Sequence, residues 1–353
     1  MSQHPLYKQI QNDIKQKIMS GELRPNDRVP SEQELMDQYR VSKITVKNAL
    51  IGLADEGIVV RIQGKGTFVS ESSRLQEAIT LANRQMHPGN LIGFIVPAMT
   101  TRVEQKLLRH VEYFVRTAGY RLLVKITRES SAEEASAIQD LIDAGVSGMI
   151  IFPTEDEKYS DSLLRLSLDH FPFVFIDRYL RNIGTYCVCS DNVGGAAKAV
   201  SHLLGQGHRR IALISPENTN TAIEDRTLGY EQAYLEHNLL LDKKLWCHVP
   251  LHILRGGQGL AYIADFLSAN RDITAVFTLT AETSVLTYHA LKQTGRSLSE
   301  VQMLAFDYPE IPDVPYVNQN EEKIAEHAVK LLIDHIDGNY APEQIFVPVE
   351  LIL

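Results

Sequence analysis

Short apolar runs recur along the chain from residue 91 onward, without the alternation with polar residues that marks a half-exposed strand. They are LIGFIVP (91–97), YRLLVKI (120–126), SGMIIFP (147–153), FPFVFID (171–177), RIALISP (210–216), ITAVFTLT (273–280) and VQMLAF (301–306). Such runs are typical of strands buried on both faces of a parallel sheet. Segments of helical length separate them, so the pattern predicts a doubly wound parallel α/β body.

The segment VEQKLLRHVEYFVRTAG (103–119) illustrates the expected helices. Its apolar residues line one side of a helix, at Val103, Leu107, Val111, Phe114 and Val115, before Gly119 ends it. Ligands of doubly wound folds bind beyond the carboxyl ends of the strands, where the topology leaves a crevice. We therefore expect the functional residues of the body in the turns that follow its strands.

The first 70 residues show a helical pattern instead. Apolar residues recur at four-residue steps, at Leu6, Ile10, Ile14 and Ile18, which predicts a helix that Gly21 ends. A second helix is expected over SEQELMDQY (31–39), where Ser31 and Glu34 have the spacing of a capping box.

A third helix is expected over SKITVKNALIGLADEG (42–57), with Ser42 as its N-cap and Gly57 at its end. Four apolar residues supply its packing face: Ile44, Val46, Leu50 and Leu53. The segment IVVRIQGKGTFV (58–69) then alternates into two strands around QGKG. Three helices followed by a hairpin make a winged helix-turn-helix.

In a helix-turn-helix the N-terminal residues of the last helix face the DNA major groove. Here those positions carry Ser42, Lys43, Thr45 and Lys47. Lys43 and Lys47 are four residues apart and share one helix face. The alternative is an ordinary solvated face, because exposed lysine is common.

The expected wing has its own chemistry. Gly64 and Gly66 allow the backbone to turn and to approach phosphates closely, and Lys65 adds charge at the tip. Gln63 can hydrogen-bond to base edges in a minor groove. Taken alone, QGKG is also compatible with a plain turn.

Charge is distributed unevenly over the 353 residues, whose net charge is −9. Residues 1–70 hold 10 Lys and Arg against 8 Asp and Glu (+2), and residues 71–353 hold 25 against 36 (−11). The whole surface is therefore unsuited to nucleic acid, whereas a basic head on an acidic body is a polarised molecule. No apolar run approaches the roughly 18 residues of a membrane span, and MSQHPLYKQI does not resemble a signal peptide, so we expect a cytoplasmic protein.

Three cysteines, Cys187, Cys189 and Cys247, are too few for a disulfide framework or a four-ligand zinc site, and we expect them to be small apolar residues in strands. The chain lacks the G-x-S-x-G, H-E-x-x-H and G-x-x-x-x-G-K-S/T motifs. No enzymatic activity, cofactor or metal is expected.

The polar segment SESSRLQEAITLANRQMHPGN (70–90) lacks apolar periodicity and ends with Pro88 and Gly89. We expect a linker over 71–89, which separates a head (1–70) from a body (90–353).

The head resembles the DNA-binding domain of the GntR family of bacterial repressors over residues 5–70, through IMSGELRPNDRVPSEQEL and YRVSKITVKNALIGLADEGIVVRIQGKGTFV. The resemblance implies DNA contacts at Gln33, at Ser42, Lys43, Thr45 and Lys47, and at residues 63–66. The family often has Arg where Gln33, Lys43 and Lys47 stand. Lysine lacks the planar fork of a guanidinium, which shifts affinity toward phosphate contacts.

The body resembles the effector-binding domain of the LacI family, and hence periplasmic sugar-binding proteins, through GVSGMIIFP, FVFIDR, SDNVGGAAKAVSHLLGQGHRRIALIS, DRTLGYEQAY and AFDYPE. The resemblance implies a two-lobed parallel α/β sensor domain that binds a small sugar. Carried over, the effector contacts fall on Asp177, Arg226, Asp307 and Gln319, with Asn220, Thr100 and Thr101 as weaker candidates. Carboxylates accept from sugar hydroxyls and an arginine fork donates to them.

Two of these residues have other possible roles, because Asp307 can cap a helix and Arg226 can form a surface ion pair. The chain also departs from the LacI pattern at two places. It has Thr280 and Ala281 where the family commonly has Asn-Asp, and only His252 near residues 252–256, where an aromatic stacking residue is expected.

A GntR-type head on a LacI-type body implies a repressor of carbohydrate-utilisation genes that a small sugar such as arabinose releases from double-stranded operator DNA. We expect a homodimer, formed through helices flanking the body such as residues 103–118. The alternative is a sugar-binding or carbohydrate-processing protein whose N-terminal unit only contacts a protein partner.

Overall fold

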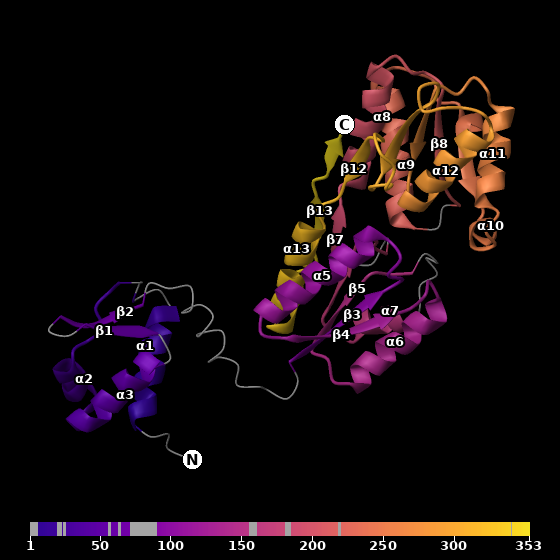
Figure 1. Ribbon diagram of the computed structural model, residues 1–353. Helices are drawn as coiled ribbons and strands as arrows, with labels where there is room; N and C mark the ends of the chain where they lie inside the picture. The colour runs from indigo at the N-terminus through magenta and orange to yellow at the C-terminus, as the bar shows by residue number, and fades with distance from the viewer. Residues whose placement is uncertain are drawn as a thin grey trace. The chain divides into compact units, whose positions relative to one another are not determined.

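The computed structural model divides into two units, Met1–Pro88 and Gly89–Leu353, called here the head and the body (Figure 1). The structure describes residues 6–19, 23, 26–55, 58–62, 65–70, 90–154, 161–180, 185–217, 220–339 and 341–353. The expected linker (71–89) lies outside the described residues, as do Gly21, Gly57, Gln63 and Gly64.

The described residues of the head form three helices and a hairpin, which confirms the expected winged helix-turn-helix. Its elements are α1 (Leu6–Met19), α2 (Glu32–Tyr39), α3 (Lys43–Asp55), β1 (Val59–Ile62) and β2 (Gly66–Val69). The two strands pair antiparallel, with Val59 opposite Val69 and Ile62 opposite Gly66. Apolar residues of all five elements form one core, which includes Ile10, Leu35, Leu50, Val59 and Val69.

The capping box of α2 is present. The Glu34 backbone N–H donates to Ser31 Oγ at 3.3 Å, and the Ser31 N–H donates to Glu34 Oε2 at 2.7 Å. The prediction that Ile44 and Leu6 pack in the core was wrong, because their exposed fractions are 69 % and 53 %. Ile44 lies one residue from Thr45 and Lys43, on the outer side of α3 rather than in the core.

The first lobe of the body is a six-stranded parallel sheet. Its order is β13 (Gln344–Val347), β7 (Tyr186–Ser190), β6 (Phe173–Ile176), β5 (Gly148–Ile151), β3 (Leu91–Val96) and β4 (Arg121–Ile126). The helices α5 (Arg102–Thr117) and α13 (Glu321–Ile336) lie side by side on one face (Figure 1). The other face packs against α6 (Ser131–Asp143) and α7 (Asp161–Leu168).

The second lobe repeats this arrangement. Its sheet order is β14 (Glu350–Ile352), β12 (Tyr316–Asn318), β11 (Gln302–Phe306), β10 (Ala275–Thr278), β8 (Ile211–Pro216) and β9 (Trp246–Val249), with only β14 antiparallel to its neighbour. One face packs against α8 (Asn192–Gly205) and α9 (Thr221–Glu236). The other packs against α11 (Gly259–Ala269) and α12 (Ala281–Gln293), which follow the short helices η1 (Lys243–Leu245) and α10 (Leu251–Arg255).

The chain passes between the lobes three times, from β7 to α8, from β12 to α13, and from β13 to β14. Each passage takes only one to two residues, so the lobes are joined along one edge, called here the hinge because lobe closure in such folds turns at residues of this kind.

All seven expected strands of the body are present, and the strands expected around the cysteines are β7 and β9. One expectation was wrong: β4 is not buried on both faces, because it lies at the sheet edge and exposes Leu123, Val124 and Ile126. The three cysteines are free and buried, as expected for small apolar residues in strands.

None of the helices in the described part of the chain has the length and apolar character that crossing a bilayer requires. Among the same residues, no group of three or more His, Cys, Asp or Glu is arranged to hold a metal ion.

The packing of α8 on α9 depends on Gly229. A Cβ at this position would lie 2.3 Å from the Val193 carbonyl oxygen and 2.8 Å from the Ala196 Cβ. Because backbone cannot yield as a flexible side chain does, we expect Gly229→Ala to lower the free energy of unfolding by about 1–3 kcal/mol. Urea denaturation measures this. Gly205→Ala is the matched control, since a Cβ there meets nothing within 4 Å; an equal loss in both variants would contradict the packing argument.

Candidate functional site

The outer side of α3 presents exposed cations. Lys43 and Lys47 are exposed, and Lys65 is exposed at the hairpin tip, where its N–H donates to the Ile62 carbonyl at 3.0 Å. Two other cations of the head are paired, Arg61 with Glu32 at 2.6 Å and Lys17 with Asp13 at 3.5 Å. No carboxylate of the described residues pairs with Lys43, Lys47 or Lys65. These three charges are therefore available to an external anion.

The polar residues around these lysines are held by local contacts. Ser42 Oγ and Thr45 Oγ1 lie 2.9 Å apart, and the Thr45 N–H approaches Ser42 Oγ at 3.4 Å, which fixes the start of α3. Gln33 on α2 is exposed and donates from Nε2 to Asp37 Oδ1 at 3.1 Å. Gln33 must therefore release or share this contact to reach a base.

Gly66 begins β2 with a φ of 125°, a conformation that side chains rarely adopt, so the expected need for glycine is met at this wing position. Sequence reasoning missed Arg40. It lies in the turn between α2 and α3 with a φ of 51°, is exposed, and adds a cation close to the start of α3.

The body has a cavity of about 310 Å³ between its lobes. The cavity is lined by all seven residues predicted from the sequence as effector contacts: Thr100, Thr101, Asp177, Asn220, Arg226, Asp307 and Gln319. They come from both lobes and from the passage between β12 and α13. A molecule in this cavity therefore contacts both lobes at once.

Two aspartates occupy equivalent positions in the two sheets. Asp177 follows β6 and Asp307 follows β11, and both have left-handed backbone, with φ of 65° and 72°. Each N–H donates to the neighbouring strand, Asp177 to Val188 at 3.1 Å and Asp307 to Val317 at 3.0 Å. The left-handed turn ends the strand and keeps each carboxylate at the carboxyl end of its sheet. Asp307 caps none of the helices described.

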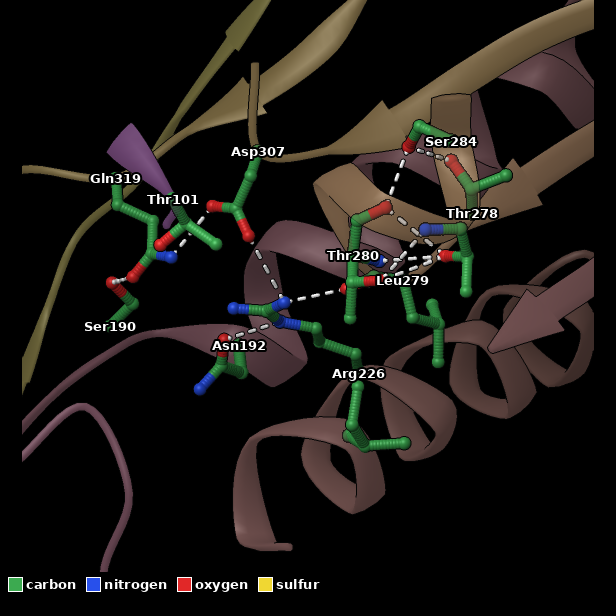
Figure 2. A network of polar contacts seen from close by, with 12 residues as sticks. Thr101, Ser190, Asn192, Arg226, Thr278, Leu279, Thr280, Ser284, Asp307 and Gln319 are labelled. Carbon is green, nitrogen blue, oxygen red and sulfur yellow. Dashed lines mark hydrogen bonds and ion pairs between the residues drawn. The ribbon is translucent and has the colours of Figure 1, made fainter. Parts of the chain in front are cut away.

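Arg226 is the centre of a buried polar network (Figure 2). It is 4 % exposed, which excludes a surface ion pair. Its Nη1 donates to the Leu279 carbonyl at 2.6 Å and to Asp307 Oδ2 at 3.3 Å, and its Nε donates to Asn192 Oδ1 at 2.9 Å. The guanidinium carbon also lies 3.7 Å from the centre of the Phe306 ring. Nη2 donates to none of the described residues, so this N–H edge is free for a ligand.

The network continues across the hinge. Gln319 Nε2 donates to Asp307 Oδ1 at 2.6 Å, and Ser190 Oγ donates to Gln319 Oε1 at 2.5 Å. Ser190 ends β7 of the first lobe, whereas Asp307 follows β11 of the second. Figure 2 shows this chain from Ser190 to Arg226. Hydrogen bonds therefore connect Arg226 to residues of two of the three passages between the lobes.

Asp177 is only 7 % exposed, and none of the described residues donates a hydrogen bond to its carboxylate. Burial raises its pKa to about 6, against the opposing effect of Arg178 and Arg226. A ligand hydroxyl that donates to this carboxylate would supply the missing hydrogen bond and favour the ionised form.

The weaker candidates have structural roles of their own. Asn220 Oδ1 accepts from the Ile223 N–H at 3.0 Å and caps α9, and Nδ2 donates to none of the residues that the structure describes. Thr101 caps α5, and the Thr100 and Thr101 N–H groups both donate to Glu104 Oε2 at 2.8 Å. Helix capping therefore fixes the cavity wall, and the Thr100 hydroxyl and Asn220 Nδ2 are the groups left to contact a ligand.

Sequence reasoning missed two aromatic residues of the cavity wall, Phe152 and Tyr308. His252, the only ring near the expected stacking position, does not line the cavity; Leu251, Leu254 and Arg255 do. Phe152 follows β5, and Tyr308 follows Asp307, so the rule that strand ends carry the site would have found both. Thr280 lines the cavity and also caps α12. At this position the chain therefore has a hydroxyl where the LacI family commonly has the amide of an asparagine.

Each of the two units matches a known protein family. Residues 6–69 match the family "Bacterial regulatory proteins, gntR family", and residues 90–333 match the family "Periplasmic binding proteins and sugar binding domain of LacI family". An arabinose metabolism transcriptional repressor of Geobacillus stearothermophilus is 28% identical over 318 residues, which is 86% of this chain and 82% of that protein.

Solved structures share the fold. A complex of the transcriptional regulator CelR with cellobiose has a TM-score of 0.66 at 20% identity and covers 92% of this chain and 99% of that one. A LacI family transcriptional regulator from Enterococcus faecium with bound ribose has a TM-score of 0.63 at 23% identity and covers 74% of this chain and 97% of that one.

The burial of Asp177 predicts a pH-dependent stability. Because its pKa of about 6 lies above the ordinary value of 3.8, the folded state favours the protonated carboxyl, and ionisation opposes folding as the pH rises between these values. The difference corresponds to about 3 kcal/mol. We expect Asp177→Asn to raise the free energy of unfolding by about 1–3 kcal/mol near neutral pH and to lose this advantage below about pH 4, as measured by urea denaturation across pH.

The control for this measurement is Asp140→Asn. Asp140 is 52 % exposed and paired with Lys125, so its loss should have little effect or a small destabilising one at neutral pH. An Asp177→Asn variant that is less stable than the wild-type protein near pH 7 would contradict the burial argument.

Proposed function

The chain belongs to the family of periplasmic binding proteins and sugar binding domains of the LacI family and carries a head of the gntR family, and from this we propose that it is a repressor that a small sugar releases from operator DNA. Its relatives are transcriptional regulators, and the chain is not an enzyme. In this proposal residues 1–70 bind DNA, residues 71–89 link the head to the body, and residues 90–353 bind the sugar. The protein acts in the cytoplasm. Arabinose is the first candidate, because the relative from Geobacillus stearothermophilus is described as an arabinose metabolism repressor.

The observation that carries the proposal is that both lobes line one cavity beside the hinge. A sugar there would donate hydroxyls to Asp177 of the first lobe and accept from Arg226 Nη2 of the second. Such a ligand favours one lobe arrangement over others, because it gains both sets of contacts only there.

The head supports the DNA half of the proposal. Lys43, Lys47 and Lys65 are exposed and lack carboxylate partners among the described residues. In the winged helix-turn-helix they lie on the helix and hairpin that approach the major and minor grooves. Lysines favour phosphate contacts over bidentate base contacts, so affinity should depend strongly on salt.

Release requires that the sugar distinguish two states of the protein. A tenfold loss of DNA affinity needs about 1.4 kcal/mol of difference between the affinities of the two states for the sugar. One or two hydrogen bonds made only in the closed arrangement suffice for this, since each contributes about 1 kcal/mol.

Two heads on a pseudo-palindromic operator imply a homodimer. A surface that includes α5 suits this role, because the adjacent edge strand β4 exposes Leu123, Val124 and Ile126. Unpaired strand edges with apolar side chains are usually covered by a partner.

The alternative function is a sugar-binding protein whose head contacts only a protein partner. It differs from the proposal in one measurable respect, because it requires no salt-dependent binding to duplex DNA.

DNA binding is tested with Lys47→Ala. The variant removes one exposed cation that makes no ion pair, so we expect the slope of log affinity against log salt to fall by about one. Affinity should weaken roughly fivefold near 0.15 M salt, which is the contribution of about one released counterion. Fluorescence anisotropy with labelled fragments of the protein's own genome measures both quantities.

Lys198→Ala provides the control, because Lys198 is an exposed lysine of the body on α8. It should leave both the affinity and the salt slope unchanged. Equal effects of the two substitutions would favour nonspecific attraction, and no DNA binding by the wild-type protein would favour the alternative function.

A further inference from the structure

The cations of the cavity are matched by carboxylates, and from this we infer that the cavity selects an uncharged carbohydrate and rejects its phosphate ester, with Glu129 as a specificity-determining residue. The inference rests on the proposed function, because it concerns the ligand of the same cavity. It is carried by the ion pairs of the cavity wall rather than by the residues expected to contact the sugar.

Arg178 and Glu129 form the first of these pairs. Arg178 Nη1 lies 3.3 Å from Glu129 Oε1 and 3.4 Å from Oε2, and both side chains line the cavity with 14 % and 22 % exposure. The guanidinium therefore faces the cavity with a carboxylate already beside it. A phosphate group at this place would have to compete with Glu129 for the same donors.

The remaining pairs repeat this arrangement. Arg226 pairs with Asp307, both nearly buried, and Lys106 Nζ lies 3.1 Å from Glu321 Oε1. Arg102, which also lines the cavity, lies with Nε 2.5 Å from Oε1 of Glu310, a residue outside the lining. Four cations of the wall are thus neutralised from within the protein.

The charge balance of the cavity is negative. Of the side chains that line it, five are cationic and six are carboxylates, a formal balance of −1. A phosphate monoester carries about 1.5 to 2 negative charges near neutral pH. A phosphate group is held by unpaired arginines and by uncapped helix N-termini. The N-termini of α5, α9 and α12 at this cavity are already capped by Thr101, Asn220 and Thr280, so the group would meet a surplus of carboxylates instead. Like charges placed together cost several kcal/mol, so an ester should bind at least about a hundredfold more weakly than its parent sugar.

Glu129 can be changed without displacing Arg178, because other contacts also hold the Arg178 guanidinium. The discrimination between a sugar and its phosphate ester can therefore be tested at Glu129. Arg178 Nη1 also donates to the Pro153 carbonyl at 3.0 Å, and its guanidinium lies over the Phe152 ring, 4.9 Å from the centroid. Replacing Glu129 by glutamine keeps the shape of the wall and removes one negative charge from beside the Arg178 guanidinium. Phosphate binding should then improve.

The test is isothermal titration calorimetry of the full chain at about pH 7.5, with L-arabinose, D-ribose and D-glucose, each beside its own terminal monophosphate. In the wild-type protein, a sugar that binds should do so at least about a hundredfold more tightly than its ester. In Glu129→Gln, the ratio of the two affinities should fall at least about tenfold, since one opposing charge is removed.

Glu133→Gln is the matched control, because Glu133 forms an exposed pair with Arg128 outside the cavity. It makes the same charge change and should leave the ratio unaltered. An ester that binds the wild-type protein as tightly as its parent sugar overturns the inference but leaves the proposed function intact. An unchanged ratio in Glu129→Gln overturns the role of Glu129, and the wild-type ratio decides alone if that variant does not fold. If neither sugars nor esters bind, the proposed function itself fails.

Discussion

A guanidinium buried between strand ends constrains the second lobe of the body. Arg226 is 4 % exposed, and it is held by Asp307, Asn192 and the Leu279 carbonyl. A buried cation is tolerated only when its partners are well placed, and losing one of them typically costs about 3–5 kcal/mol. The ends of β10 and β11 and the start of α8 must therefore keep their relative positions. This requirement holds in place the part of the cavity wall around Arg226.

The same network couples the cavity to the passages between lobes. Asp307 binds Gln319, which binds Ser190 at the end of β7. In the proposed function, a ligand would contact Arg226 Nη2 and the Asp177 carboxylate, which have no hydrogen-bond partner among the described residues, and would act on both lobes through them. Coupling between a sugar site and a DNA site requires such an element with two arrangements that both ligands bias. The hinge is the candidate for that element.

The sequence predicted the architecture well because the buried strands are continuous apolar runs and the helices of the head carry clear caps, as at Ser31 and Glu34. It failed where a local pattern does not reveal the neighbours in space. Ile44 and the edge strand β4 are apolar yet exposed, and the ion pair of Arg178 with Glu129 joins residues 49 positions apart. Family resemblance indicated the residues that line the cavity, whereas the charge matching of its wall became visible only in three dimensions.

The central claim is that occupancy of the cavity sets the affinity of the head for DNA. Its most direct test is the dissociation constant of the full chain for an operator fragment, measured with and without a saturating sugar in the same buffer. We expect the complex with DNA to be at least tenfold weaker when sugar is bound, equivalent to about 1.4 kcal/mol of coupling. A sugar whose binding is demonstrated by calorimetry but which leaves the DNA affinity unchanged would contradict it.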